Sequence, residues 1–302
     1  MRRRHRLLAA AVILVTLTAC STTNPISGPT ASSSASGNVL VIGSQQYYSN
    51  EIIAEIYAQA LEAQGFTVNR QFQIGQREVY LKELEAGRID ILPEYNGNLL
   101  QYYNKSATAT TTEEITTALQ SALPAGLRVL NPAPATDQDS YNVTRATADQ
   151  YGLTSLADLT KLPQPIKLGG NSELATRPYG PTGLKAMYGV DATVTPIEDS
   201  GGPLTVKALK DGTVTAADVY SASPAIASND LVTLTDPKHM ILPQNITPLV
   251  SAKVTTQAAD VLNQVDAQLT TADLIQLNQR SVTDQQSAAT IAKAWLDQKG
   301  IH

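Results

Sequence analysis

The stretch from Val79 to Asn98, VYLKELEAGRIDILPEYNGN, organises the rest of the chain. Its apolar residues recur at helical spacing up to Gly87, where a glycine would end the helix. The apolar run Ile89–Leu92 then predicts a short strand, and Tyr95 follows just past it. This order is typical of an α/β crossover, and ligands of open α/β sheets sit outside the carboxyl ends of the strands. We therefore expect Tyr95 at a ligand site.

The same pattern returns 125 residues later. Leu204–Gly212 predicts a second helix with a glycine stop, Val214–Val219 predicts a second strand, and Tyr220 follows it. A further pair lies at almost the same offset, VLVIGS (Val39–Ser44) against PIKLGG (Pro165–Gly170). A generic helix-to-strand pattern could explain one pair, but the near-constant offset of the second favours a structural repeat. The chain is thus predicted to form two similar α/β lobes whose strand ends face a shared cleft.

Residues 1–20 have the pattern of an export signal rather than of part of the fold. Four arginines stand in front of or beside the apolar run Leu7–Ala19, which is too short to span a bilayer. The run ends in Leu-Thr-Ala before Cys20, the only cysteine of the chain, and this resembles a bacterial lipoprotein signal. The alternative is an ordinary secretory signal with a chance cysteine. The thiol directly after a small residue favours lipidation at Cys20, and hence an extracytoplasmic protein anchored to the cell membrane.

Residues 21–38 (STTNPISGPTASSSASGN) cannot form a core, and we interpret them as a flexible tether. Without the four arginines of the leader, 18 Lys and Arg remain against 27 Asp and Glu, a formal net charge of −9. No basic stripe is present that could neutralise phosphates, so nucleic-acid binding is not expected. The remaining length suits two lobes of ordinary domain size, and no apolar run after residue 20 is long enough for a transmembrane helix.

Proline and aspartate interrupt the regular pattern at two places. Asn131–Ser140 (NPAPATDQDS) predicts a first crossing between the lobes, and Asp236–Gln244 predicts the second. We therefore expect residues 39–138 to begin the first lobe, residues 139–235 to form the second, and residues 236–302 to cross back and complete the first.

Two smaller expectations concern the first lobe. The first strand ends in a polar tip, and Ser49 or Asn50 is predicted to cap the helix Glu51–Ala63 that follows it. Trp295, on the last of three predicted C-terminal helices, is expected to pack in the core rather than against a ligand.

Residues that could support catalysis are few. The histidines His5, His239 and His302 do not pair with cysteine or with one another at metal spacing, so neither a metal nor another cofactor is expected. Asp90 and Glu94 lie four residues apart, but we expect structural hydrogen bonds from them rather than acid–base catalysis. An extracytoplasmic hydrolase would need a nucleophile–base pair, and the sequence offers none. We therefore do not expect an enzyme.

Tyrosine is the prominent aromatic residue, with 12 against two phenylalanines and one tryptophan. Aromatic faces aimed into a cleft suit a cation that cannot donate hydrogen bonds, such as a quaternary ammonium group. For any single tyrosine, packing at the rim with a solvated hydroxyl is the alternative. A structural or adhesive lipoprotein would show no convergence of these rings. The tyrosines at predicted strand ends or crossings are Tyr47, Tyr48, Tyr95, Tyr141, Tyr179 and Tyr220.

Several segments together resemble the substrate-binding lipoproteins of ABC transporters for quaternary-ammonium osmoprotectants (glycine betaine, choline, carnitine), chiefly actinobacterial members. The clearest are VLVIGSQQYYSNEIIAEIYAQALEAQGF, LEAGRIDILPEYNGN, ELATRPYGPTGLKAMYG, LKDGTVTAADVYSASPAI and DPKHMILPQNITPLV. The resemblance runs from about Val39 to Ile301 and implies an α/β fold, that of a type II periplasmic binding protein with two α/β lobes joined by two crossover strands. It also implies a small-molecule ligand, a cleft that closes on it, and ABC permease and ATPase subunits as partners. We expect a monomer.

The resemblance extends to the ligand site. Tyr95, Tyr141 and Tyr220 fall on three tyrosines of the family's aromatic cage. Asp139 falls on a position whose backbone lines that cage. Arg177, in ELATRP, falls on the arginine that grips a ligand carboxylate through charge-assisted hydrogen bonds.

Three positions depart from the family pattern. Gln244 replaces a fourth cage tyrosine, Gln45 replaces a lysine that helps to hold the carboxylate in some members, and Asn98 replaces a threonine in the same role. Three aromatic faces at about 2 kcal/mol each give roughly 6 kcal/mol, whereas a micromolar site needs about 8 kcal/mol. The alternative is therefore a receptor for another polar or aromatic ligand, a polyphenol or an amino-acid betaine, which would use the three amides better.

Overall fold

The structure is a computed structural model that describes residues 39–302. The predicted signal peptide, the tether and the lipidation site Cys20 lie outside the described residues. The described part of the chain belongs to one compact unit. No helix among residues 39–302 is both long enough and apolar enough to cross a membrane.

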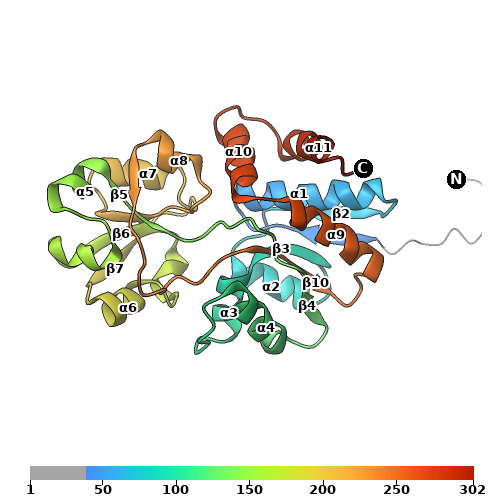
Figure 1. The fold of residues 1–302 in the computed structure, drawn as a ribbon, viewed down its shortest axis with the longest axis horizontal. Helices are drawn as coiled ribbons and strands as arrows, with labels where there is room; N and C mark the ends of the chain where they lie inside the picture. The colour runs from blue at the N-terminus through green and yellow to red at the C-terminus, as the bar shows by residue number, and fades with distance from the viewer. Residues whose placement is uncertain (1–38) are drawn as a thin grey trace, which may run out of the picture. The chain divides into compact units, whose positions relative to one another are not determined.

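The first lobe is built on a five-stranded sheet with the order β2-β1-β3-β10-β4 (Figure 1). Strand β1 is parallel to β2 and β3, whereas β10 is antiparallel to β3 and β4. The elements of this lobe are β1 (Leu40–Gly43), α1 (Tyr48–Ala63), β2 (Val68–Gln71), α2 (Arg77–Glu85), β3 (Ile91–Tyr95), α3 (Asn96–Tyr103), α4 (Thr112–Ala122), β4 (Leu127–Val129), β10 (Ile246–Ser251), α9 (Thr256–Gln268), α10 (Thr271–Val282) and α11 (Ala288–Lys299).

The second lobe has a sheet of the same plan, with the order β7-β6-β8-β5-β9. Strand β6 is parallel to β7 and β8, and β5 is antiparallel to β8 and β9. The elements of this lobe are β5 (Tyr141–Thr144), α5 (Arg145–Tyr151), the 3₁₀-helix η1 (Leu156–Lys161), β6 (Ile166–Gly170), the 3₁₀-helix η2 (Ser172–Thr176), α6 (Pro181–Gly183), the π-helical turn η3 (Leu184–Tyr188), β7 (Ala192–Pro196), α7 (Pro203–Lys210), β8 (Ala216–Asp218), α8 (Pro224–Ser228) and β9 (Leu231–Thr233).

The two sheets match strand for strand, so the predicted repeat is a repeat of architecture. The helices that precede β3 and β8 also end in the same way. Gly87 after α2 has φ +70° and Gly212 after α7 has φ +71°, a left-handed conformation that glycine adopts without the steric cost of a Cβ atom. Each of these glycines donates its N–H to a leucine carbonyl, Gly87 to Leu84 at 3.0 Å and Gly212 to Leu209 at 3.2 Å.

The central strand β3 begins two residues later than predicted and includes Tyr95 as its last residue. Its partner β10 decides these bounds, because Ile91 to Tyr95 pair in register with Val250 to Ile246. Pro93 faces Pro248 in this ladder, so the two missing N–H groups fall at the same point.

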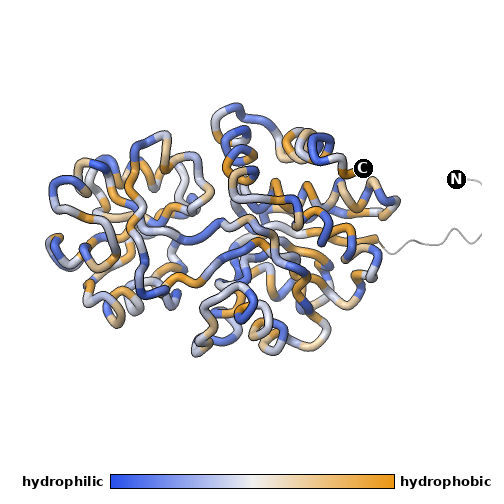
Figure 2. The backbone as a smooth tube through the Cα atoms, viewed as in Figure 1, coloured by the Kyte–Doolittle hydropathy of each residue, from blue (hydrophilic) through white to orange (hydrophobic). Residues whose placement is uncertain are grey.

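Apolar side chains cover both faces of the first sheet. One buried cluster joins α1 to the C-terminal helices α9, α10 and α11, and another joins the sheet to α2, α3 and α4. Figure 2 shows the apolar residues gathered on the strands and on the helices beside them. Trp295 is 2% exposed within the first cluster, which confirms its predicted place in the core.

Two irregular segments join the lobes, one between β4 and β5 and the other between β9 and β10 (Figure 1). They bond to each other, since Thr136 and Asn245 form an antiparallel bridge and Asp137 donates its N–H to the carbonyl of Gln244 at 3.3 Å. The two crossings are therefore coupled along part of their length. The predicted boundaries after residues 138 and 235 fall within these segments and stay predictions.

Candidate functional site

One cavity is lined by residues of both lobes and of both crossings. Its volume is about 40 Å³, small beside the few hundred Å³ typical of sites for drug-sized ligands. The arrangement therefore suits a small solute. The lining residues are Gln45, Tyr47, Gln76, Arg77, Tyr95, Asn98, Asp137, Asp139, Asn171, Glu173, Leu174, Arg177, Tyr179, Asp218, Tyr220 and Gln244.

Three of the lining tyrosines are grouped together. Tyr95 ends β3, Tyr47 stands just before α1, and Tyr220 follows β8 of the other lobe. The ring of Tyr47 lies 5.2 Å from that of Tyr220 and 6.5 Å from that of Tyr95, measured between centroids. The hydroxyls of Tyr47 and Tyr95 are hydrogen-bonded. Rings from the two lobes therefore meet at a single place, as expected for Tyr95 and Tyr220.

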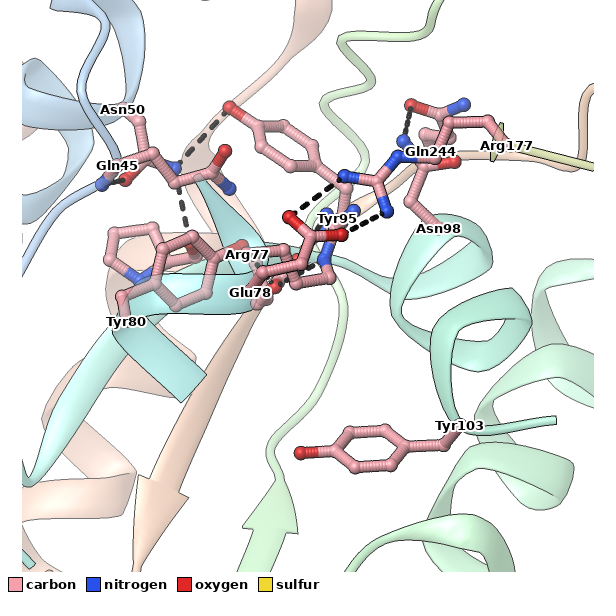
Figure 3. A network of polar contacts seen from close by, with 12 residues as sticks. Gln45, Asn50, Arg77, Glu78, Tyr80, Tyr95, Asn98, Tyr103, Arg177 and Gln244 are labelled. Atoms are coloured by element: carbon pink, nitrogen blue, oxygen red, sulfur yellow. Dashed lines mark hydrogen bonds and ion pairs between the residues drawn. The ribbon is translucent and has the colours of Figure 1, made fainter. Parts of the chain in front are cut away.

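Asn50 fixes the loop that carries Tyr47. Its Oδ1 accepts the N–H of Gln45 at 2.8 Å, and its Nδ2 donates to the carbonyl of Pro93 at 3.0 Å. A longer contact of 3.5 Å reaches the hydroxyl of Tyr95 (Figure 3). The prediction that Ser49 or Asn50 caps the helix was wrong, because α1 begins at Tyr48 and its N-cap residue has no side-chain cap. Asn50 instead ties the first strand end to the third.

Tyr141 does not join this group and is not among the lining residues. It is 1% exposed in the core of the second lobe, where its hydroxyl donates to the backbone carbonyl of Tyr179 at 2.5 Å. The structure thus does not bring Tyr141 to the cavity, whereas Tyr47 and Tyr179 do line it. Both had been marked only as tyrosines at strand ends or crossings.

Two of the three amides that depart from the family pattern, Asn98 and Gln244, meet at Asp139. Asn98 Nδ2 donates to Asp139 Oδ2 at 2.7 Å, and Gln244 Nε2 donates to the same oxygen at 3.0 Å. Asn98 Nδ2 also lies 3.0 Å from Gln244 Oε1. The side chain of Asp139 thus lines the cavity and is held by amides. Gln45 Nε2 and Asn98 Oδ1 are buried without a hydrogen-bond partner among the described residues.

Arg177 lines the cavity from the second lobe, at the end of η2. Its Nη1 lies 2.7 Å and its Nη2 3.4 Å from the carboxylate oxygens of Glu78, which belongs to α2 of the first lobe (Figure 3). The arginine expected to hold a ligand carboxylate therefore holds a carboxylate of the protein.

A second arginine, Arg77, lines the cavity and is also paired. Its Nε and Nη2 each lie 2.9 Å from Glu94, and the hydroxyl of Tyr80 donates to the same carboxylate at 2.5 Å. Glu94 is fully buried, so its role is structural, as expected. Asp90 is likewise structural, because it accepts the N–H of Val41 at 2.8 Å and pairs with Lys253 at 2.9 Å.

Acidic groups dominate the rest of the lining. Burial raises the pKa of Asp137 to about 7. Burial, followed by the neighbouring carboxyl of Asp139, raises the pKa of Asp218 well above its usual range. Burial also raises the pKa of Glu173. The sequence pattern does not single out Asp137, Asp218 or Glu173, although each stands within four residues of a predicted site residue.

The lining of the site is predominantly polar. Its polar groups are amides, phenols, carboxyls and paired guanidinium groups. Among residues 39–302, no group of three or more His, Cys, Asp or Glu side chains could hold a metal ion.

Two α/β lobes of one plan, joined by two segments and enclosing a cavity, define a two-lobed solute-binding protein of the type II periplasmic class. The family described as "Substrate binding domain of ABC-type glycine betaine transport system" (OpuAC) matches residues 38–298, and the chain belongs to this family. The chain accordingly binds a small-molecule ligand and works with an ABC transporter outside the cytoplasm. The family is one of transport proteins and not of enzymes.

Similar proteins agree with this assignment. The glycine betaine-binding protein YehZ of Escherichia coli (strain K12) is 29% identical over 282 residues, which are 86% of this chain and 90% of that protein. The glycine-betaine-binding protein of Pseudomonas aeruginosa PAO1 is 25% identical over 277 residues, with coverages of 87% and 88%.

Solved structures show the same fold. A crystal structure titled as a glycine betaine/carnitine/choline ABC transporter has a TM-score of 0.70 at 22% identity, over 87% of this chain and 99% of that chain. Apo YehZ of Escherichia coli has a TM-score of 0.63 at 25% identity, over 88% and 100%. These relatives do not favour the alternative ligands, a polyphenol or an amino-acid betaine.

Proposed function

We propose that this chain captures a small quaternary-ammonium osmoprotectant of the glycine betaine, choline and carnitine class in the cavity between its lobes. The observation that carries the proposal is the meeting of Tyr95 and Tyr220, one from each lobe, at a single cavity together with Tyr47. The names of the relatives point to the same ligand class.

The chemistry of the lining suits such a ligand. A quaternary ammonium group has no N–H to donate, so a protein recognises it through aromatic faces, each worth up to about 2 kcal/mol when desolvated. Buried carboxyls add a long-range attraction for the positive charge. We assign direct contact to Tyr47, Tyr95 and Tyr220. The amides of Gln45 and Asn98 provide a donor and an acceptor that have no partner among residues 39–302.

Delivery completes the proposed role. The lobes, residues 39–138 with 236–302 and residues 139–235, close on the ligand by hinge movement at the two crossings. The closed monomer then meets the permease, which the ATPase subunits drive. A lipid on Cys20 keeps the receptor at the outer side of the cell membrane.

Calorimetry with the purified receptor tests the ligand. Choline, glycine betaine and carnitine are titrated into the protein, with gallate as the aromatic comparison. Tyr220→Ala is expected to weaken binding by about 30-fold, since one desolvated cation–π face contributes about 2 kcal/mol. Tyr103→Ala is the matched control, because this tyrosine bonds to Glu85 away from the cavity. Unchanged affinity in Tyr220→Ala, or binding of gallate alone, would contradict the proposal.

The anchor has its own test. Cys20→Ser in the full-length protein is expected to move the receptor from the membrane fraction to the soluble fraction and to abolish labelling by a fatty-acid probe. Retention of both properties would exclude lipidation at this residue.

A further inference from the structure

We propose that Glu78 sets the charge selectivity of the cavity. By pairing with Arg177 across the two lobes, it withdraws the guanidinium group that a ligand carboxylate would need, so the cavity prefers a net cation to a zwitterion. This inference rests on the proposed function and adds to it the charge class of the ligand. Glu78 itself is a specificity residue that acts through Arg177.

The lining of the cavity contains more acidic than basic side chains. It contains two arginines and four carboxyls, a formal charge of −2 when all are ionised. The carboxyls belong to Asp137, Asp139, Glu173 and Asp218. The first two and the last are buried, and Glu173 is half-buried. Burial raises the pKa of Asp137, Glu173 and Asp218 in the empty cavity, and a ligand that brings a positive charge favours their ionised forms.

Both arginines of the lining, Arg77 and Arg177, already have carboxylate partners. Arg77 makes two bonds of 2.9 Å to Glu94 within the first lobe. Arg177 makes bonds of 2.7 and 3.4 Å to Glu78 across the lobes. Neither Glu78 nor Glu94 lines the cavity, so both guanidinium groups are neutralised from outside it. A ligand carboxylate would have to compete with Glu78 for Arg177.

The four carboxyls of the lining have no cationic side chain as a partner within the described part of the chain. Among residues 39–302, none of the four forms an ion pair with Lys, Arg or His. Their hydrogen bonds come from neutral donors, such as the N–H of Ala222 to Asp137 at 2.9 Å and that of Ser140 to Asp218 at 3.1 Å. A cationic ligand would supply the missing charge, whereas a carboxylate would add repulsion.

Unused hydrogen-bonding atoms point the same way. Within the described part of the chain, Asn98 Oδ1 is a buried acceptor without a donor, and Gln45 Nε2 is a buried donor without an acceptor. A ligand hydroxyl can satisfy both kinds of atom, since it donates and accepts. Glycine betaine has neither O–H nor N–H to offer, whereas choline has a hydroxyl and no carboxylate.

Glu78, the partner of Arg177, can be substituted to change the selectivity without loss of the fold. Its side chain is 45% exposed, whereas that of Glu94 is fully buried. The side chain of Arg177 is only 12% exposed and stays at the cavity wall. Loss of the charge on Glu78 therefore frees the guanidinium group of Arg177, which already lies at the cavity wall, to bind a ligand carboxylate.

The test compares choline, carnitine and glycine betaine on wild type, Glu78→Gln and Glu78→Ala by calorimetry. Wild type is expected to bind choline more tightly than glycine betaine. Both variants are expected to lower the ratio of the betaine Kd to the choline Kd by about tenfold, which is about 1.4 kcal/mol. Carnitine, with hydroxyl and carboxylate together, is expected to gain affinity in the variants. The matched control is Glu83→Gln on the same helix, which breaks the exposed pair with Arg88.

Each outcome decides between the two proposals. If wild type binds none of the three ligands, the proposed function fails. If it binds them but prefers glycine betaine, or if both Glu78 variants keep the wild-type ratio, the function stands and the selectivity inference is overturned. A ratio that shifts equally in Glu83→Gln would also overturn it, because a general loss of negative charge would then explain the change.

Discussion

The two lobes share one strand plan but treat charge differently where they meet the cavity. In the first lobe, Glu94 precedes Tyr95 and is fully buried with Arg77 bound to it through two hydrogen bonds. In the second lobe, Asp218 stands two residues before Tyr220 and is buried without a cation among the described residues. In the first lobe the carboxylate beside the cavity is therefore neutralised by Arg77, whereas in the second lobe Asp218 is a buried carboxyl whose ionised form a cationic ligand can balance.

The largest expected effect on stability comes from removing the charge of Glu94, which pairs with Arg77 in the first lobe. Glu94→Gln leaves the buried guanidinium of Arg77 without its counter-charge, and loss of one partner of a buried pair costs about 3–5 kcal/mol. The free energy of unfolding, measured in urea, should fall by that amount. Glu83→Gln, which breaks an exposed pair, should change it by about 1 kcal/mol or less. Equal losses of unfolding free energy in Glu94→Gln and Glu83→Gln would show that the buried pair of Arg77 and Glu94 stabilises the fold no more than the exposed pair does.

A second effect should come from Asp137 in the crossing between the lobes. Its folded-state pKa of about 7 lies above the ordinary value of 3.8, so the folded state holds a proton that the unfolded state has lost between these values. The stabilisation is complete below about pH 4 and is lost as the pH rises to about 7, at most about 4 kcal/mol. The groups that face this carboxyl are the hydroxyls of Tyr47 and Ser49, the N–H of Ala222 and the carboxyl of Asp139.

Urea unfolding of the ligand-free protein between pH 4.5 and 7.5 measures this dependence. The difference between wild type and Asp137→Asn should shrink or reverse as the pH rises. A difference independent of pH would mean that Asp137 does not titrate in this range.

A smaller effect on stability should come from Asp218 in the second lobe. Asp218→Asn is expected to change the free energy of unfolding by less than about 1 kcal/mol, since no buried cation loses its partner. It should weaken choline binding by about tenfold, because the positive charge of the ligand loses its Coulomb attraction to a buried carboxylate. Calorimetry and urea unfolding on the same variant give both values. A large loss of stability without loss of affinity would reverse the comparison of the two lobes.

The smallest effect concerns Tyr141, which the sequence had grouped with Tyr95 and Tyr220. Tyr141→Phe removes a buried hydrogen bond to the carbonyl of Tyr179 and should cost about 1 kcal/mol of stability. Ligand affinity should stay within about twofold of wild type, as judged by calorimetry. A loss of affinity as large as that of Tyr220→Ala would return Tyr141 to the cage.

The position of Tyr141 outside the cavity lining has a physical reason. Successive side chains of a strand point to opposite faces, so a ring at a strand end reaches the cavity or the core according to register. Tyr141 begins β5, pairs with Asp218 and faces the core. Tyr95 ends β3 and Tyr220 lies beyond β8, and both reach the cavity. Sequence spacing alone could not separate these cases.

The repeat at 125 residues, the glycine ends at Gly87 and Gly212, and the approach of Tyr95 and Tyr220 to one cavity were determined by the sequence itself. They depend on local periodicity and on backbone conformations that particular residues favour, and these can be recognised within a short stretch. Only the tertiary structure decided the partner of Arg177, the two amides on Asp139 and the lack of ion pairs to the lining carboxyls among residues 39–302. These features depend on which side chains two distant segments bring within hydrogen-bonding distance, and Arg177 and Glu78 are 99 residues apart in the chain.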